Sequence, residues 1–508
     1  MVLRAANKSV VIGQAVCEIK AVGERKSRQK TAPPLEGANG LTMAPESMRR
    51  LVNAATEALI ERAGRLNDAK AWDGEFREVL KDRLGSLPPE DGRPAEEVLT
   101  QVVQEVLPFA ARLDHPRFFG FVPSSPTWPG VVADYLSAGF NINSCTWLVS
   151  SGTSQLELVV VDWLRGWIGY PDTAGGLLTS GGSAASVEAL VAARMAAGHP
   201  DRPTVYMSDQ SHSALKRAAV IVGVRRENVR LVCSGDDFRI DMAELRRRVD
   251  EDRANGLQPV AVCANAGTTS TGAVDPLAAM AHYCASEGIW LHVDAAYGGF
   301  SLVTEEGKEV LDGIELADSV GMDAHKWFFQ PYEAGALMVK DGTHLESAFA
   351  IGSDYLQDTV WGTNHPNFAD RGLQLSRTAR ALKIWMSVQT FGMAAFRSAV
   401  RRGLALARRA DQYVKSSPML ESLAPVSLSI LCFRINPGGH DEGALEKANR
   451  QVLARVFWDE LAFLSSTSLK GVFSLRLCIL NHTTTWEDVE RTLDLVVQLG
   501  EEALAAGD

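Results

Sequence analysis

The sequence predicts an α/β protein whose large domain is built around a mostly parallel sheet, with a helical N-terminal arm and a smaller C-terminal α+β domain. Between residues 175 and 340, short apolar runs alternate with helical stretches, which is the pattern of βα units. The predicted strands are Thr204–Met207, Leu231–Cys233, Val260–Ala264, Ile289–Val293 and Ala334–Val339. Helices are predicted between them, for example at Ala184–Ala197 and Pro276–Ser286.

The segments on either side of this region follow other patterns. Residues 1–42 are expected to be a disordered tail, because they hold the basic run Arg25–Lys30 and no apolar core of signal-peptide length. A start of the protein at Met43 is an alternative. Residues 43–110 are expected to form a helical arm, in which Leu51 and Leu59 lie on one face and Pro94 begins a second helix.

The remaining boundaries follow from the same patterns. The large domain is expected to span residues 111–388, and the small C-terminal domain residues 389–508. In the small domain we predict helices at 395–415, 442–463 and 486–504, and strands at Ser427–Ile435 and Val472–Leu480. A chain of 508 residues, 46% of them hydrophobic, has enough apolar material for these two or three domains.

Composition excludes several classes of function. The chain has 51 Lys and Arg residues against 62 Asp and Glu residues, so a net charge of −11 makes nucleic acid and anionic membrane poor partners. No uncharged apolar stretch reaches the roughly 18 residues of a membrane span. The seven cysteines include no CxxC pair, which argues against a disulfide framework or a structural zinc site. We therefore expect a cytoplasmic protein without a bound metal.

Five short motifs lie at the ends of predicted strands, where α/β sheets bind their ligands. They are Thr179–Ser186, Ser208–Ser213, Gly267–Gly272, His292–Gly299 and Ser319–Trp327. Each has an ordinary structural explanation when taken alone: a helix cap, a surface loop, a polar turn, a salt bridge, or a lysine whose ammonium reaches solvent. Their order along one chain carries more information than any single motif.

Together the motifs supply the contacts of one cofactor. Gly182 and Ser183 begin a helix and suit a phosphate. His212 can stack on a ring or move protons. Asp294 ends a hydrophobic strand and needs a cationic partner, such as a protonated pyridine nitrogen. Lys326 lies in an apolar segment, so we expect burial to lower its pKa and free its amine to form an imine with an aldehyde. The set predicts pyridoxal 5′-phosphate (PLP).

The sequence resembles the group II PLP-dependent decarboxylases, which include the aromatic-L-amino-acid, histidine and glutamate decarboxylases. The resemblance runs from about His115 to Trp385 and more loosely to the C-terminus. It rests on the blocks His115–Gly120, Asp162–Leu164, Ser208–Ser213, His292–Tyr297, Asp323–Trp327 and Leu475–Cys478. It implies a type-I PLP-dependent transferase fold with a mostly parallel seven-stranded sheet. It also implies α-decarboxylation of an L-amino acid, with aromatic ones among the candidates, by a homodimer whose active site lies at the subunit interface.

The resemblance also implies roles for individual residues. Lys326 would hold the cofactor as an imine, Asp294 would keep the pyridine nitrogen protonated, and His212 would stack on the ring near the substrate carboxylate. Tyr355 falls where the family carries the tyrosine of a mobile catalytic loop, which protonates the substrate carbon after CO₂ leaves. Further cofactor contacts are expected from Gly182, Ser183, Thr269, Ala296 and His325.

The substrate side is expected to be formed by Val122, Ser124, Asn143 and Cys145. Aromatic-acid members commonly carry bulkier apolar or aromatic residues where Val122, Asn143 and Cys145 stand, which argues against a large aromatic substrate. Asp323 stands where many members have Asn near the phosphate. A like charge there is unfavourable unless another group compensates for it.

Two other functions are compatible with the same motifs. An aldehyde synthase of this family decarboxylates its substrate and then deaminates it oxidatively with O₂; there the loop tyrosine is typically phenylalanine, or the stacking histidine is altered. The presence of Tyr355 and His212 favours simple decarboxylation. A catalytically inactive regulatory homologue is the second alternative, and the retention of Lys326 and Asp294 argues against it.

Overall fold

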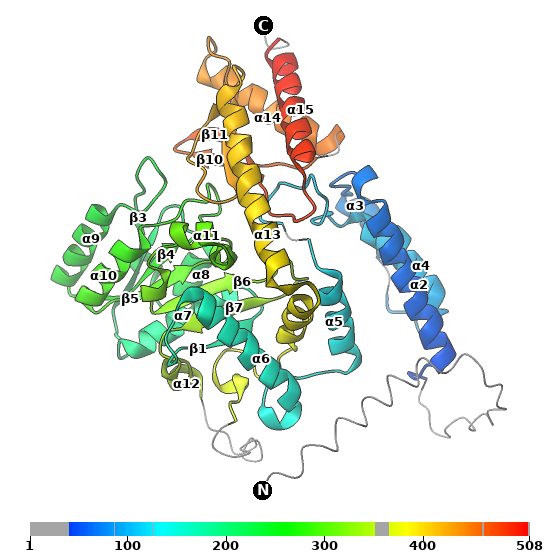
Figure 1. The fold of residues 1–508 in the computed structure, drawn as a ribbon, viewed down its shortest axis with the longest axis horizontal. Helices are drawn as coiled ribbons and strands as arrows, with labels where there is room; N and C mark the ends of the chain where they lie inside the picture. Colours follow the sequence, from blue (N-terminus) through cyan, green and yellow to red (C-terminus); the bar gives the residue numbers. More distant parts are fainter. Residues whose placement is uncertain (1–39, 86, 124, 351–364, 460–461, 506–508) are drawn as a thin grey trace. The chain divides into compact units, whose positions relative to one another are not determined.

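The computed structural model describes residues 40–85, 87–123, 125–350, 365–459 and 462–505 (Figure 1). The chain divides into two compact units, Met1–Ile60 with Asp91–Thr100, and Glu61–Glu90 with Gln101–Asp508. In the first unit, Arg50 Nε donates to Glu96 Oε1 at 3.1 Å and links α2 (Pro45–Gly64) to α4 (Ala95–Gln101). The arm was predicted to start at residue 43 and its second helix at Pro94, and the two helices begin close to these positions, at Pro45 and Ala95. The domain boundaries at residues 42, 110 and 388 remain a prediction.

The second unit contains a seven-stranded sheet in the order β1-β7-β6-β5-β4-β2-β3. Its strands are β1 (Gly175–Thr179), β2 (Pro203–Ser208), β3 (Val229–Val232), β4 (Gln258–Asn265), β5 (Trp290–Asp294), β6 (Ser319–Asp323) and β7 (Gly335–Val339). Neighbours from β6 to β3 pair in parallel, whereas β7 is antiparallel to both β6 and β1. The predicted α/β fold with a mostly parallel sheet is therefore confirmed.

Helices cover both faces of this sheet, which explains why its strands read as continuous apolar runs. On one face Val262, Val293 and Val320 belong to a buried cluster with side chains of α6 (Trp147–Ile168) and α10 (Leu277–Glu287). On the other face Met207 and Cys263 pack with side chains of α7 and α8. Successive residues of a strand point to opposite faces, so neighbouring positions of the central strands are both buried and mostly apolar.

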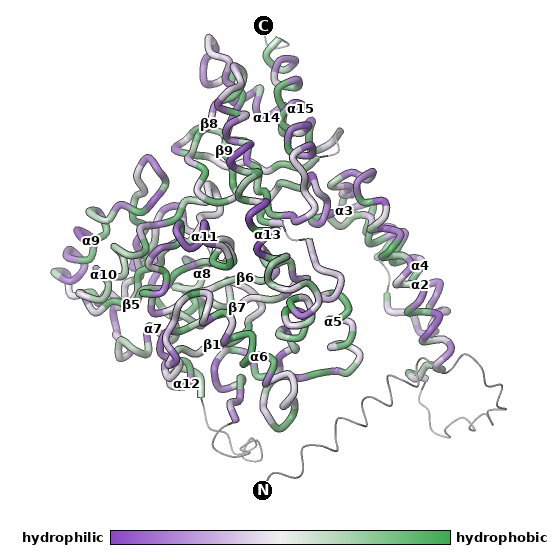
Figure 2. The backbone as a smooth tube through the Cα atoms, viewed as in Figure 1, coloured by the Kyte–Doolittle hydropathy of each residue, from purple (hydrophilic) through white to green (hydrophobic). Residues whose placement is uncertain are grey.

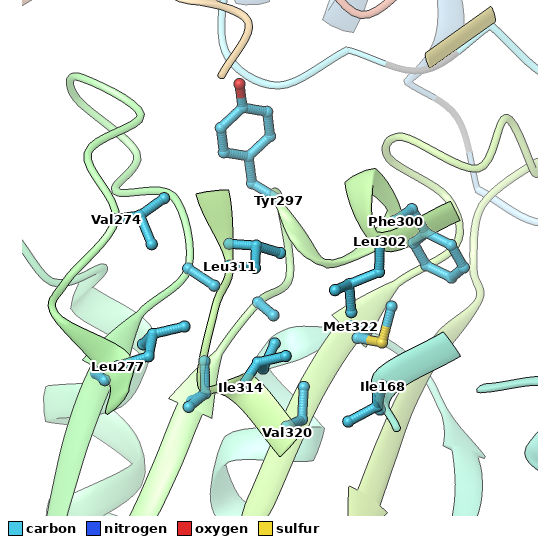
Figure 3. Packing of buried hydrophobic residues seen from close by; sticks show 14 of the residues in the cluster. Ile168, Val274, Leu277, Tyr297, Phe300, Leu302, Leu311, Ile314, Val320 and Met322 are labelled. Atoms are coloured by element: carbon cyan, nitrogen blue, oxygen red, sulfur yellow. The ribbon is translucent and has the colours of Figure 1, made fainter. Parts of the chain in front are cut away.

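The second unit contains further helices before residue 350. They are α3 (Arg77–Leu84), α5 (Trp128–Gly139), α7 (Gly182–Ala196), α8 (Ser213–Ile221), α9 (Met242–Ala254), α11 (Glu305–Val310) and α12 (Thr343–Phe349). Figure 3 shows part of the first face, where Ile314, Val320 and Met322 gather beside the strands. Tyr297 extends away from these side chains, and its hydroxyl lies 2.6 Å from Ser429 Oγ.

A second, antiparallel sheet lies near the C-terminus in the order β10-β11-β9-β8. Its strands are β8 (Leu420–Ser422), β9 (Ile430–Ile435), β10 (Ser465–Leu469) and β11 (Val472–Cys478), and its helices are α14 (Glu442–Asp459) and α15 (Trp486–Ala505). The long helix α13 (Arg380–Ser416) leaves helical geometry at Gly392, where φ is +70°. This break lies close to the predicted start of the small domain. None of the helices in the described ranges is long and apolar enough to cross a membrane.

Candidate active site

The predicted cofactor residues meet at one edge of the seven-stranded sheet. Asn265, Asp294 and Asp323 are the last residues of β4, β5 and β6, and Asn265 is directly paired with Asp294. Because these strands are parallel, their carboxyl ends lie side by side. A cavity of about 350 Å³ opens there, and its lining residues are Val122, Ser180, Gly181, Gly182, Ser183, Ala184, His212, Ala214, Asn265, Gly267, Thr269, Asp294, Ala296, Tyr297, Asp323, His325 and Lys326.

The glycines before α7 are required by their surroundings. Gly181 has φ +147°, which strongly favours glycine. A Cβ on Gly182 would lie 2.9 Å from Ala296 Cβ and 3.3 Å from Asp323 Oδ2, so a side chain would displace the cavity wall. The backbone N–H groups of Gly182 and Ser183 start the helix and have no acceptor among the residues that the structure describes. This turn therefore presents donors to an anion, as predicted for a phosphate.

Lys326 forms an ion pair that the sequence analysis did not anticipate. Its Nζ lies 3.0 Å from Asp323 Oδ2. Burial alone lowers the pKa of Lys326, but the carboxylates of Asp323 and Asp294 outweigh burial and raise the pKa above its usual value. The expected lowering of this pKa is therefore wrong for the protein without cofactor. The lysine is half-buried, with its side chain 25% exposed, and its acidic partner lies three residues before it in the chain.

Asp294 is held at the end of β5 by a short turn. Its Oδ1 accepts a hydrogen bond from the backbone N–H of Ala296 at 3.1 Å. Burial raises the pKa of the Asp294 carboxyl, while the charge of Lys326 opposes that rise. A second cation beside the carboxylate would stabilise its ionised form further, and a protonated pyridine nitrogen is such a cation.

His212 is the N-cap of α8. Its Nδ1 accepts the backbone N–H of Ala214 at 3.2 Å. In the neutral ring the hydrogen must then be on Nε2, because one nitrogen accepts and the other donates. The cap thus fixes the ring orientation, and the imidazole lines the cavity with a donor available.

The three other predicted cofactor contacts also line the cavity. Ala296 is buried and follows Asp294 in the same turn. Thr269 is exposed in the cavity wall, and its carbonyl oxygen accepts from Arg476 Nε at 3.0 Å. His325 is buried with its Nδ1 beside the backbone of Ala334, and burial lowers its pKa. Its ring is therefore neutral near pH 7.

The predicted substrate residues do not all meet in one chain. Val122 lines the cavity, whereas Asn143 and Cys145 are not among its lining residues. Asn143 Oδ1 instead accepts the backbone N–H of Arg377 at 3.0 Å, and Cys145 is buried. Ser124 and Tyr355 lie outside the described residues. Their predicted roles remain predictions.

Sequence analysis missed Asn265 and Tyr297 as wall residues of the cavity. Asn265 Nδ2 donates to Ser211 Oγ at 3.0 Å and to Asp275 Oδ2 at 2.8 Å, which connects the histidine loop to β4. A polar residue at the end of an otherwise apolar strand was a usable signal for Asn265. Tyr297 gave no such signal, because a tyrosine beside glycines fits any turn.

The residues present fit PLP. The turn at Gly182 offers backbone donors to a phosphate, Asp294 offers a carboxylate to a ring nitrogen, and Lys326 offers an amine to an aldehyde, all in one cavity. Asp323 Oδ1 is also buried without a hydrogen-bond partner among the described residues, so the cavity contains an unsatisfied acceptor. The chemistry of this donor and acceptor set matches the three polar ends of the cofactor.

Comparisons with known proteins agree with this geometry. Residues 79–436 match the pyridoxal-dependent decarboxylase conserved domain. The chain is 34% identical to an aromatic-L-amino-acid decarboxylase of Bacillus atrophaeus, over 91% of this chain and 97% of that relative. It is also 34% identical to a phenylacetaldehyde synthase of Arabidopsis thaliana, over 80% of this chain and 85% of that relative.

Solved structures show the same likeness. The crystal structure of Oryza sativa TDC with PLP and tryptamine aligns with a TM-score of 0.86 at 28% identity, covering 91% of this chain and 99% of that one. The sequence match spans most of the chain, and the structural match places the same fold around a PLP site. The chain belongs to the pyridoxal-dependent decarboxylase family.

Proposed function

We propose that the protein removes the α-carboxylate of an L-amino acid, giving the amine and CO₂, with PLP as cofactor. The observation that carries this proposal is the meeting of Lys326, Asp294 and His212 around one cavity at the carboxyl edge of the sheet. These residues lie at or just after the carboxyl ends of three different strands, β2, β5 and β6. Their meeting supports a catalytic site over an inactive regulatory homologue.

The contacts of Lys326, Asp294 and His212 in the cavity suggest a separate role for each residue. PLP, when bound, accepts the electron pair that the departing carboxylate leaves behind. Lys326 Nζ would hold the cofactor through its aldehyde and would give up that place to the substrate amine. Asp294 keeps a proton on the pyridine nitrogen, which makes the ring a better electron acceptor. His212 places its Nε2 hydrogen in the cavity, where it can orient the substrate carboxylate.

An aromatic amino acid is the first substrate class to screen. The relatives include decarboxylases named for aromatic amino acids, tyrosine and tryptophan. Of the residues that argued against a large aromatic side chain, only Val122 lines the cavity of a single chain, and valine leaves room rather than filling it. Asn143 and Cys145 do not restrict this cavity from within the same chain.

Oxidative deamination to an aldehyde is the second candidate function, because aldehyde synthases are among the relatives. The test is to supply single L-amino acids, starting with phenylalanine, tyrosine and tryptophan, and to measure CO₂, amine, aldehyde and oxygen uptake together. We expect amine in step with CO₂ and little oxygen uptake. If aldehyde and peroxide were formed in amounts equal to the CO₂ released, the function would be aldehyde synthesis and not simple decarboxylation.

Replacing Tyr355 by phenylalanine should change the product. Loss of a general acid costs about 10²–10⁴-fold in the proton-transfer step, so amine formation should fall while the share of aldehyde and peroxide rises. The measurement is the amine-to-aldehyde ratio of the Tyr355→Phe variant beside the native enzyme. Tyr413→Phe, which removes a hydroxyl bonded to Asp494 on the C-terminal helices, serves as the matched control. An unchanged ratio in Tyr355→Phe would remove Tyr355 from the mechanism.

We also propose that the protein acts as a homodimer. The segment from α5 to the start of α6 exposes large apolar side chains, including Tyr135 at 56%, Phe140 at 77% and Val149 at 58% exposure. In Figure 2 green stretches of the tube alternate with paler ones along α5. Such a patch is unusual on a monomer and typical of an interface. Asn143 and Cys145 lie within this segment, so a second copy is where they would act on substrate.

The dimer can be tested by sedimentation at micromolar concentration. We expect the native protein to sediment as a dimer and Phe140→Asp to shift it toward monomer, because a buried charge without a partner disfavours association. Ile221→Asp, at a position that is 61% exposed on α8, is the matched control and should stay dimeric. A native protein that sediments as a monomer would contradict the proposal.

The compartment remains a proposal. We propose a reducing, cytoplasmic setting, as expected from the cysteine pattern. Its support is that the cysteines at positions 145, 233, 263, 284, 432 and 478 are all free thiols.

A further inference from the structure

Asp323 is a carboxylate inside the predicted phosphate site. It is 2% exposed, and its Oδ1 has no hydrogen-bond partner within the described ranges. Ideal Cβ positions built on Gly181 and Gly182 would lie 3.7 Å and 3.3 Å from its nearer oxygens. The carboxylate therefore lies directly against the turn that starts α7. We call Gly181, Gly182, Ser183 and Asp323 the phosphate cradle.

The cradle lacks a spare cation to balance a phosphate dianion. Lys326 is the one lysine among the described lining residues of the cavity, and no arginine lines it. The helix start contributes N–H donors and about half a positive charge. Lys326 is already paired with Asp323 Oδ2 at 3.0 Å, and its amine is the group that must bind the cofactor aldehyde. One carboxylate and a dianion would then face each other without a counter-charge.

A shared proton resolves this conflict. The second ionisation of a phosphate ester has a pKa of about 6 in water, and a neighbouring negative charge favours the protonated form. A phosphate ester holds this proton more tightly than an ordinary aspartic carboxyl does. The proton should therefore remain on the phosphate and be donated to the unpartnered carboxylate oxygen.

We propose that the cradle binds the cofactor phosphate as its monoanion, whose hydroxyl donates a hydrogen bond to Asp323. This inference rests on the PLP assignment and is independent of which amino acid is the substrate. It gives a role to a buried carboxylate that lies against the turn expected to hold the phosphate. The N–H group of an asparagine at this position would donate a hydrogen bond to a phosphate dianion. The carboxylate of Asp323 can only accept, so the hydrogen must come from the phosphate.

The other charged groups near Asp323 do not remove the need for this proton. His325 Nε2 lies 3.5 Å from Asp323 Oδ2, but burial lowers the pKa of His325, so this ring is not a permanent cation like an arginine or a lysine. Tyr332, in the turn before β7, is a neutral phenol because burial raises its pKa. Asp294, at the end of β5, is a carboxyl group and supplies no positive charge. The residues at the start of α7 carry no charge.

Phosphorus NMR of the loaded enzyme tests the proposal directly. Free PLP at pH 4 and pH 9 gives reference shifts for the monoanion and the dianion. At pH 8 we expect the native enzyme to show the monoanion shift and Asp323→Asn to show the dianion shift. A native spectrum at the dianion shift would overturn the proposal, whatever the state of the variant.

Binding measured against pH gives a second test, with 5′-deoxypyridoxal as the matched ligand. This analogue keeps the aldehyde and lacks the phosphate, so dividing its Kd by that of PLP isolates the contribution of the phosphate. For the native enzyme this ratio should fall about tenfold per pH unit above pH 7, since the monoanion becomes scarce above its pKa of about 6. For Asp323→Asn the ratio should be nearly flat.

Glu188→Gln is the control for this pH profile. Glu188 is another buried carboxyl on α7, and burial raises its pKa to about 7, but it does not line the cavity. Its removal should leave the slope of the native enzyme unchanged. If the Kd ratio changed equally with pH in the native enzyme and in Asp323→Asn, the proposal would be overturned. The protonation state of the bound phosphate would then not depend on the carboxylate of Asp323.

Discussion

Replacing Lys326 by alanine is expected to reduce turnover to the background rate and to abolish covalent retention of the cofactor. The alanine has no amine to bind the aldehyde, and Lys326 is the one lysine among the described residues that line the cavity. The measurement is borohydride treatment of the reconstituted variant, followed by desalting and mass spectrometry of the protein. We expect the native chain to keep the reduced cofactor and the variant to lose it.

The variant also leaves Asp323 without its ion-pair partner, so the fold must be checked separately by circular dichroism and thermal unfolding. Lys308→Ala removes an exposed lysine paired with Glu305 and should behave as the native enzyme does. A Lys326→Ala chain that still retained cofactor after borohydride treatment would show that another lysine carries it.

The strands that could be predicted are those with mostly apolar sequences; β1 and β6, which were missed, are just as buried. β2, β4 and β5 are runs of apolar residues because helices cover both sides of the sheet, and the sequence shows them directly. β1 and β6 were not predicted as strands. Their sequences Gly175–Thr179 and Ser319–Asp323 contain glycines, a serine and an aspartate. A Cβ on Gly321 would lie 3.4 Å from Ala185 Cβ, which is an ordinary contact, so this glycine weakens the strand signal without being required by packing.

The sequence predicted which cofactor-binding residues come together better than it predicted the electrostatic interactions between them. Asp294 and Lys326 follow neighbouring strands, so the topology alone brings them together. The predicted direction of the pKa shift of Lys326 was wrong because only burial was considered. The carboxylate of Asp323 becomes its partner only when the turn after β6 folds back. Asn143 and Cys145, which were predicted to contact the substrate, do not line the cavity of their own chain, and a single sequence does not reveal contacts between two copies of a chain.

Replacing Asp294 by asparagine should lower kcat on the order of 10²–10³-fold, the usual cost of removing one preorganised electrostatic contact at a reacting group. The amide oxygen can still accept the Ala296 N–H, so the turn should survive. The amide cannot hold a proton on the pyridine nitrogen, and the ring then accepts the electron pair of the departing carboxylate less well. The measurement is kcat and KM for the best amino acid, with cofactor content from absorbance.

Asp318→Asn is the matched control, since Asp318 lies at the opposite end of β6, where its carboxylate accepts the backbone N–H of Leu291 at 2.7 Å. The same chemical change there should leave kcat within a few-fold of the native value. A structural role for Asp294 predicts loss of cofactor or a lower melting temperature with kcat per bound cofactor preserved. The catalytic role predicts the reverse: full cofactor content, a native melting temperature and a KM close to native, with the loss confined to kcat. If Asp294→Asn bound the cofactor and kept a near-native kcat, the prediction would be contradicted, and groups other than Asp294 would be responsible for the rate enhancement.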